Sequence, residues 1–196
     1  MSWTAASRWG RASDGQALKR RKPGVWDRAR LRRAALAYLS RYAAPSAHVR
    51  RLLRRRLERG AARGAEIRAG EEDIDAVLAD LVRMGLIDDR AWAEAQARAL
   101  RRRGASARGL AARLSSRGAP REEIERLLAR EDDAAELEAA RALARRRRLG
   151  QWRDPAERAA RRQKDLAAMA RAGFRLDAAR QVIDADGPPD DGSGFQ

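Results

Sequence analysis

The chain has 196 residues and carries 44 lysines and arginines against 28 aspartates and glutamates, which gives a net charge of +16 and favours polyanionic partners. It contains no cysteine and one histidine, His48, so we exclude disulfide bonds, His- or Cys-based metal sites and serine-histidine-acid catalysis. No apolar run approaches the roughly 20 residues of a membrane helix, and no signal-peptide core opens the chain, which predicts a cytoplasmic protein without membrane contact.

Residues 1–26 predict a disordered basic arm. The segment is rich in serine, glycine, arginine and lysine, has no helical period, and carries Trp3, Trp9 and the Lys19–Lys22 cluster. Its basic and aromatic side chains could touch nucleic acid, whereas a solvated tail is the simpler interpretation. The sequence leaves both open.

Residues 27–87 predict a first unit of three helices. The first helix is expected to run from an N-cap at Asp27 to Tyr42, and Ser46 is expected to cap the second. The apolar stripes of these two helices are Leu31, Ala35, Tyr38 and Tyr42, then Val49, Leu52, Leu53 and Leu57. The string GAARGAEIRAG, at about residues 60–70, has the composition of a loop and predicts an insertion before the third helix.

The second helix carries the densest basic face of the chain. The arginines that lie off its apolar stripe are Arg50, Arg51, Arg54, Arg55 and Arg56. Such a run is usually a solvated helix face, but five arginines with only Glu58 nearby repel one another unless an anion neutralises them. We therefore interpret this face as a candidate polyanion-binding surface.

The link between the third and fourth helices is the clearest helix boundary in the sequence. Apolar residues at helical spacing stop at Gly85, which adopts a left-handed C-cap without steric cost. Leu86 and Ile87 are then expected to turn inward, and Asp88 or Asp89 to cap the next helix. The expected buried stripe of that helix is Trp92, Ala95 and Ala99, and Ala93 completes the motif.

Two further units follow, at residues 88–130 and 131–185, before a flexible acidic tail at 186–196. Asp132 and Asp133 open an alanine-rich helix as Asp88 and Asp89 do, and positions 89 and 133 differ by 44. Periods of this size are typical of tandem helical units that cannot bury their apolar faces alone. The sequence thus predicts an all-α protein of three tandem three-helix repeats in a curved, elongated array.

Further arginine clusters lie in these later units and are additional candidates for binding. They are Arg101, Arg102 and Arg103; Arg145, Arg146 and Arg147; and Arg161 and Arg162. The first two clusters stand at helix C-termini, where positive charge complements the helix dipole.

The sequence contains no recognisable catalytic motif. It has no GxxxxGK[ST] string and no GxGxxG after a strand, so nucleotide hydrolysis and dinucleotide binding are not expected. The two aspartate pairs could in principle hold Mg²⁺, but their positions at helix starts make capping the favoured interpretation. We therefore predict no catalytic residue, no metal and no cofactor.

Three short motifs in the sequence resemble those of a known family. Gly-Leu-Ile-Asp-Asp followed by Ala-Trp-Ala, from Gly85 to Ala93, the segment from Arg113 to Gly118, and Ala-Gly-Phe from Ala172 to Phe174 resemble the RecX recombination regulators. The similarity extends from about residue 29 to 184. The motif positions Gly85, Leu86, Ile87, Asp88, Asp89, Trp92 and Ala93 are interpreted as architectural.

The resemblance implies a non-enzymatic function in DNA repair, linked to the SOS response. In that family, three three-helix repeats lodge in the groove of the RecA recombinase filament on DNA and limit filament growth, ATP turnover and strand exchange. The partners implied are the RecA filament and single- and double-stranded DNA, the latter bound through phosphates without sequence preference. A monomer is expected.

Two alternatives remain open from the residues themselves: a basic DNA-binding or architectural protein that acts without recombinase, and a scaffold whose charge reflects codon bias. The fold prediction names a buried set: Ile74, Leu78, Leu81, Leu86, Trp92, Leu114, Ile124 and Leu128. It also predicts the absence of a β-sheet.

Overall fold

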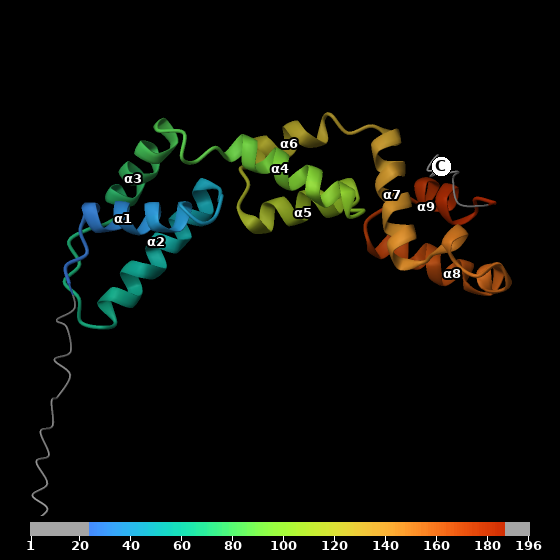
Figure 1. Cartoon of the computed structure of the whole chain (residues 1–196), viewed down its shortest axis with the longest axis horizontal. Coiled ribbons are helices and arrows are strands. Elements are labelled where there is room, and N and C mark those ends of the chain that lie inside the picture. Colours follow the sequence, from blue (N-terminus) through green and yellow to red (C-terminus); the bar gives the residue numbers. More distant parts are fainter. Residues whose placement is uncertain (1–23, 187–196) are drawn as a thin grey trace, which may run out of the picture.

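The computed structural model describes residues 24–186, and this part of the chain is helical throughout (Figure 1). The helices are α1 (Arg28–Leu39), α2 (Ser46–Ala61), α3 (Glu71–Arg83), α4 (Asp89–Arg102), α5 (Ala107–Arg117), α6 (Arg121–Leu128), α7 (Asp133–Arg147), α8 (Pro155–Arg171) and α9 (Leu176–Ile183), with a 3₁₀ turn, η1 (Gly150–Trp152). Within the described range the β structure is a single isolated bridge, between Trp26 and Ile67. The all-α prediction is confirmed.

Aspartates begin four of these helices. Asp27, Asp88, Asp132 and Asp154 each accept a hydrogen bond from a backbone amide of the first turn. Such caps satisfy amides that have no partner within the helix. Ser46 behaves differently from the prediction, because Pro45 is the N-cap residue of α2 and no side chain caps that helix.

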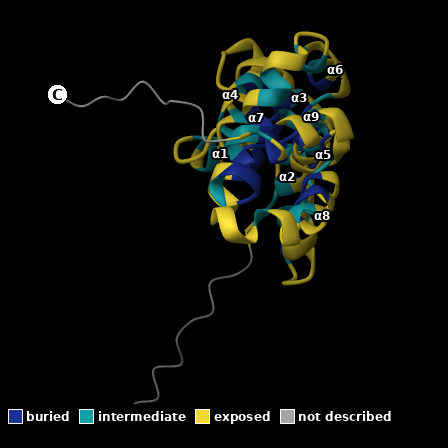
Figure 2. Ribbon diagram, turned by 90° about the vertical axis from the view of Figure 1, so that its right-hand side faces the viewer, coloured by how far each residue is buried: buried dark blue, intermediate teal, exposed yellow. Residues whose placement is uncertain are grey.

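Three hydrophobic clusters divide the array along its length, as Figure 1 shows for the helices that contain them. The first cluster draws on α1 to α3, the second on α4 to α6, and the third on α7 to α9. We call these sets of helices the first, second and third groups. Viewed from one end of the array, buried backbone lies inside and exposed backbone outside (Figure 2). The grouping agrees with the helices of the predicted units, whose status as tandem repeats stays a prediction.

The predicted core is mostly correct. Ile74, Leu78, Leu81, Leu114 and Ile124 are buried. Leu86 was expected to turn inward and is instead 48% exposed, so that prediction is wrong. Ile87, which is 2% exposed, is instead the residue of the link that packs in the first cluster.

Three other packing predictions need correction. Trp92 and Leu128 are only partly buried at the edge of the second cluster. The buried stripe of α4 is Ala93, Ala97 and Leu100, because the helix is rotated by one residue relative to the predicted Trp92, Ala95 and Ala99 stripe. Helix α1 ends at Leu39, which leaves Tyr42 58% exposed beyond it.

The insertion between α2 and α3 folds back on the start of the described chain. Trp26 donates its backbone amide to the Glu66 carbonyl at 2.8 Å, and its own carbonyl accepts the amides of Arg68 and Ala69. Its indole packs on the first cluster and close to Gly60. Trp26, the last residue of the predicted arm, is therefore ordered. Residues 1–23 and 187–196, which hold the rest of that arm and nearly all of the predicted tail, lie outside the described residues.

Candidate polyanion-binding surfaces

The basic face of α2 meets carboxylates from α3. Arg54 donates from Nε and Nη2 to the two carboxylate oxygens of Glu71, at 2.7 Å each, and Arg50 pairs with Asp75. The hydrogen bonds with Glu71 raise the pKa of Arg54, and the same bonds hold the pKa of Glu71 below its usual value. The neighbouring helix thus relieves part of the repulsion expected along α2, at Arg50 and Arg54.

Two of the other three arginines predicted on this face, Arg51 and Arg55, have different surroundings. Arg51 donates from Nη2 to the backbone carbonyl of Arg117, in α5, at 3.2 Å, so it reaches from the first group to the second. Arg55 is exposed. Of the four predicted binding arginines of α2, Arg55 is therefore the one that the described contacts leave most available.

His48 lies beneath these arginines. Its Nε2 is 2.9 Å from the Tyr38 hydroxyl, and the two rings stack with centroids 5.5 Å apart. Partial burial, followed by the positive charges of Arg51 and Arg55, lowers the pKa of His48 from 6.5. His48 therefore contributes to the packing of the first group of helices rather than to its positive charge.

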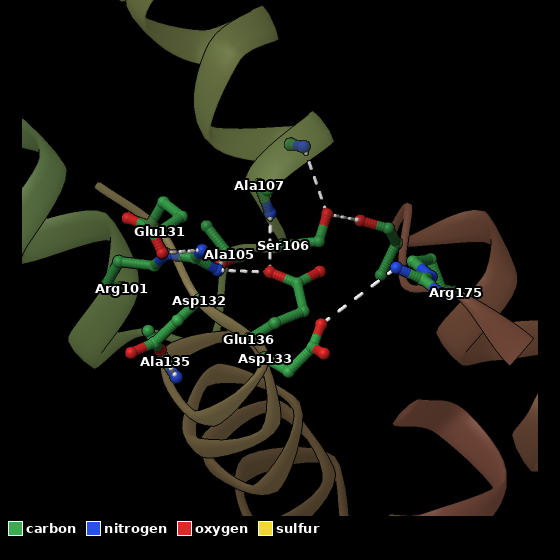
Figure 3. Close-up of polar contacts among 12 residues, drawn as sticks. Arg101, Ala105, Ser106, Ala107, Glu131, Asp132, Asp133, Ala135, Glu136 and Arg175 are labelled. Atoms are coloured by element: carbon green, nitrogen blue, oxygen red, sulfur yellow. Dashed lines mark hydrogen bonds and ion pairs between the residues drawn. The ribbon is translucent and has the colours of Figure 1, made fainter. Parts of the chain in front are cut away.

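Arg101 occupies the boundary between the second and third groups. Its Nη1 donates to Glu136 at 2.7 Å and to the Ala105 carbonyl at 2.8 Å, and Nη2 pairs with Glu131 (Figure 3). Burial disfavours the charged guanidinium, but these carboxylates outweigh it and raise the pKa of Arg101. We therefore assign Arg101 to the architecture of this boundary and leave it out of the candidate binding surface.

Two more polar contacts join the same groups, and Figure 3 shows them beside Arg101. The buried Ser106 hydroxyl donates to the Ala172 carbonyl at 2.7 Å and accepts the Gly109 amide at 3.0 Å. Glu136 also accepts the Ala107 amide at 2.9 Å. We call this boundary the second junction, and the boundary between the first and second groups the first junction.

At the second junction the backbones of α4 and α7 approach closely. Gly104 ends α4 with a φ of +76°, and a Cβ placed there would lie 2.4 Å from the Leu143 amide nitrogen. Glycine is therefore required by both the backbone angle and the contact.

An open cleft of about 380 Å³ lies next to this contact. Its arginines come from the C-terminal halves of α4, α5, α7 and α8 and their caps: Arg103, Arg113, Arg117, Arg146, Arg147 and Arg171. The rest of the lining is small or aliphatic: Leu100, Gly104, Ala105, Leu143 and Ala172. No carboxylate is part of this lining. We call it the arginine cleft, and its chemistry is that of an anion site.

The predicted clusters contribute to the arginine cleft only in part. Arg103, Arg146 and Arg147 line it, whereas Arg102, Arg145 and Arg161 are exposed and outside its lining. Arg162 forms a two-pronged pair with Asp184, at 2.6 and 2.7 Å.

Sequence reasoning missed three residues of the cleft, namely Arg113, Arg117 and Arg171. Each comes from the C-terminal part of a helix, and Arg117 directly precedes the C-cap glycine Gly118. An arginine in the last turn of a helix is a readable signal, but it also simply complements the helix dipole. What brings the three together is the packing of separate groups, which the sequence does not display.

A second hollow, of about 600 Å³, lies at the N-terminal end of α7 and has the opposite character. Carboxylates from the start of α7 and the preceding link line it: Glu131, Asp132, Asp133 and Glu136. Its apolar floor includes Leu128 and Phe174, and Arg108 and Arg175 complete the rim. The two hollows thus give the ends of α7 opposite surroundings.

Comparison with known proteins identifies the family. The chain is 41% identical over 159 residues to the regulatory protein RecX of Myxococcus xanthus (strain DK1622), which covers 80% of this chain and 85% of that protein. The chain belongs to the RecX family. The Myxococcus xanthus relative is named as a regulatory protein. No protein-family model matches the sequence.

Solved RecX structures share the fold. A crystal structure of regulatory protein RecX aligns with a TM-score of 0.60 at 22% identity, over 81% of this chain and 72% of that one. RecX from Lactobacillus salivarius aligns with the same TM-score at 21% identity, over 80% of this chain and 94% of that one. In the described range, no helix is both long and apolar enough to cross a membrane, and no group of three or more potential metal ligands is found.

Proposed function

We propose that this chain is a non-enzymatic regulator of homologous recombination that binds the RecA recombinase filament on DNA. In this proposal it limits filament growth, ATP turnover and strand exchange, as a cytoplasmic monomer without a cofactor. The observation that carries the proposal is membership of the RecX family across most of the helical array. The elongated arrangement of three helical groups supports it, because a long surface can contact several filament subunits together with the DNA they enclose.

The charge supports the DNA component of the proposal. A net charge of +16 provides a phosphate-binding surface that does not depend on base sequence. It also supports the alternative, in which the protein coats DNA without contacting recombinase. The two functions differ in stoichiometry, because a coating protein must cover the DNA whereas one filament-bound molecule can stop the growth of many subunits.

The test measures RecA-dependent ATP hydrolysis and strand exchange against protein concentration at several salt concentrations. Affinity for bare DNA is measured on the same samples. We expect inhibition well below one molecule per RecA subunit, at salt where binding to bare DNA is already weak, because protein contacts add to the charge. Inhibition only at DNA-saturating amounts, following bare-DNA affinity across the salt series, would replace the regulator with the generic DNA binder.

A surface variant tests whether α2 contributes to filament binding. We expect Arg55→Glu to weaken inhibition without lowering the melting temperature, because Arg55 is exposed and is not part of the core. Arg121→Glu, at a highly exposed position of α6 with a 90% accessible side chain, provides a control with the same charge reversal. Equal inhibition by both variants and the unmodified chain would remove α2 from the proposed surface.

A further inference from the structure

We propose that the arginine cleft binds the sugar-phosphate backbone of a DNA strand, with Arg113, Arg146 and Arg171 as its phosphate ligands. These three residues lie on α5, α7 and α8 respectively, so the site exists only when the second and third groups are packed together. The inference deepens the proposed function, since it takes DNA from that function and names the surface that holds it.

The cleft gathers several positive charges around one hollow without a counter-charge in its lining. Elsewhere on the described surface many arginines meet carboxylates, as in the pairs Arg28–Asp80 and Arg54–Glu71, and others, such as Arg55 and Arg161, are exposed outside the cleft. Among the described residues, by contrast, five cleft arginines have neither a hydrogen bond nor an ion pair from their side chains: Arg103, Arg113, Arg146, Arg147 and Arg171. The sixth, Arg117, donates to the neutral Gln96. Several guanidinium groups around one hollow repel one another, and an anion removes that repulsion.

The lining favours a phosphodiester over an acidic peptide. The guanidinium fork matches two oxygens of one phosphate, and several forks from different helices can grip successive phosphates. An extended peptide would be expected to need main-chain hydrogen-bond partners or side-chain pockets. Around the cleft there is no aromatic residue, and the uncharged lining is limited to glycine, alanine and leucine. Because contacts to phosphates carry no direct information about the bases, we expect this contact to be independent of sequence.

The second junction holds the helices that carry these arginines in place before a ligand arrives. The Gly104–Leu143 contact lies in the cleft wall, and Ser106 and Glu136 tie the same helices together nearby. A site on packed helices loses less freedom on binding than one on mobile side chains alone. The acidic hollow at the other end of α7 repels phosphates, so the charges also select which end of α7 faces the strand.

The experiment compares two triple variants of the full chain that lose the same charge. The cleft variant is Arg113→Gln, Arg146→Gln and Arg171→Gln. The control variant is Arg33→Gln, Arg59→Gln and Arg63→Gln, at exposed positions of the first group. Binding of a mixed-sequence single-stranded oligonucleotide is followed by fluorescence anisotropy across a salt series, and circular dichroism melts establish that each variant is folded.

We expect the cleft variant to lower the slope of log affinity against log salt by about 2, because each single-strand phosphate contact contributes about 0.7. The control variant should keep nearly the original slope. If the cleft variant melts early, the double variant Arg146→Gln, Arg171→Gln, at two exposed positions, replaces it, with an expected loss of about 1.4 in slope.

Two results would overturn the inference. Equal losses in the cleft and control variants would mean that DNA binds to diffuse charge. Unchanged DNA affinity in the cleft variant, with loss of binding to RecA alone, would mean that an acidic protein segment occupies the cleft. The proposed function fails separately, if the unmodified chain does not inhibit RecA, and the cleft assignment can stand in that case.

Discussion

The two junctions of the array join similar three-helix groups in different ways. At the first junction, the Ser46 amide and hydroxyl donate to Asp89 at 2.7 and 2.5 Å, and the Trp92 indole donates to the Ala43 carbonyl at 3.2 Å. The side chains of Ser46, Asp89 and Trp92 are partly exposed. At the second junction, by contrast, the Ser106 side chain is fully buried and the backbone of Gly104 touches that of Leu143.

The difference teaches that polar contacts alone do not set the angle between neighbouring groups. Partly exposed hydrogen bonds exchange with water and contribute little net free energy, whereas direct backbone packing leaves no room for rotation. We therefore expect the second junction to be the stiffer one, and the arginine cleft depends on that stiffness.

The largest expected effect follows from replacing Arg101 with methionine. The change keeps much of the apolar stem but leaves the carboxylates of Glu131 and Glu136, which are 19% and 14% exposed, without their cation. Removing one partner of a buried pair costs about 3–5 kcal/mol. Urea unfolding should show this loss, with faster hydrogen exchange in α5 and α7 than in α1 to α3. A loss below about 1 kcal/mol would mean that the junction does not depend on this network.

A pair of glycine variants measures the backbone contact by itself. Gly104→Ala and Gly85→Ala both place a side chain at positive φ, +76° and +69°. A Cβ at position 85 meets nothing within 4 Å, so Gly85→Ala should cost only the roughly 1–2 kcal/mol of the left-handed conformation. Gly104→Ala adds overpacking of about 1–3 kcal/mol and should also weaken DNA binding. Equal unfolding free energies for the two variants would contradict tight packing at the second junction.

Asp89→Ala tests the first junction and should have a smaller effect. The substitution removes both hydrogen bonds from Ser46, at about 0.5–1.5 kcal/mol each, but water can replace them in this partly exposed place. Asp88→Ala is the control, because it removes a helix cap and no contact between groups. Small-angle X-ray scattering should report a broader shape distribution for Asp89→Ala than for Asp88→Ala. Identical scattering would mean that Asp89 does not restrain the first junction.

The smallest expected effect is a pH dependence centred on His48. Because its pKa is lowered in the folded protein, the unfolded chain binds more protons as pH falls below 6.5. The stability associated with the neutral ring is therefore full above that pH and decreases below it. We expect His48→Gln to lose less unfolding free energy than the unmodified chain between about pH 7.5 and about pH 5. Parallel losses would show that His48 does not titrate differently on folding.

Local signals in the sequence determined the helices and most of their boundaries. Gly85 and Gly118 end helices with positive φ, and Asp88 and Asp132 cap the next ones, because capping depends only on a few adjacent residues. Helical spacing likewise identified buried residues such as Ile74 and Leu114. The RecX family resemblance, which the comparison with the Myxococcus xanthus protein bears out, also rested on such local motifs.

Only the tertiary structure decided which charges are available. Arg50 and Arg54 form ion pairs with carboxylates of α3, and Arg101 forms ion pairs with Glu131 and Glu136. The sequence does not display these pairs, because the partners are far apart along the chain. For the same reason, reversing Arg50 and Arg54 to glutamate would set carboxylates against Asp75 and Glu71, and the melting temperature should fall. The arginine cleft is likewise invisible in the sequence, because its side chains come from four helices whose ends meet only when two separately packed groups are joined.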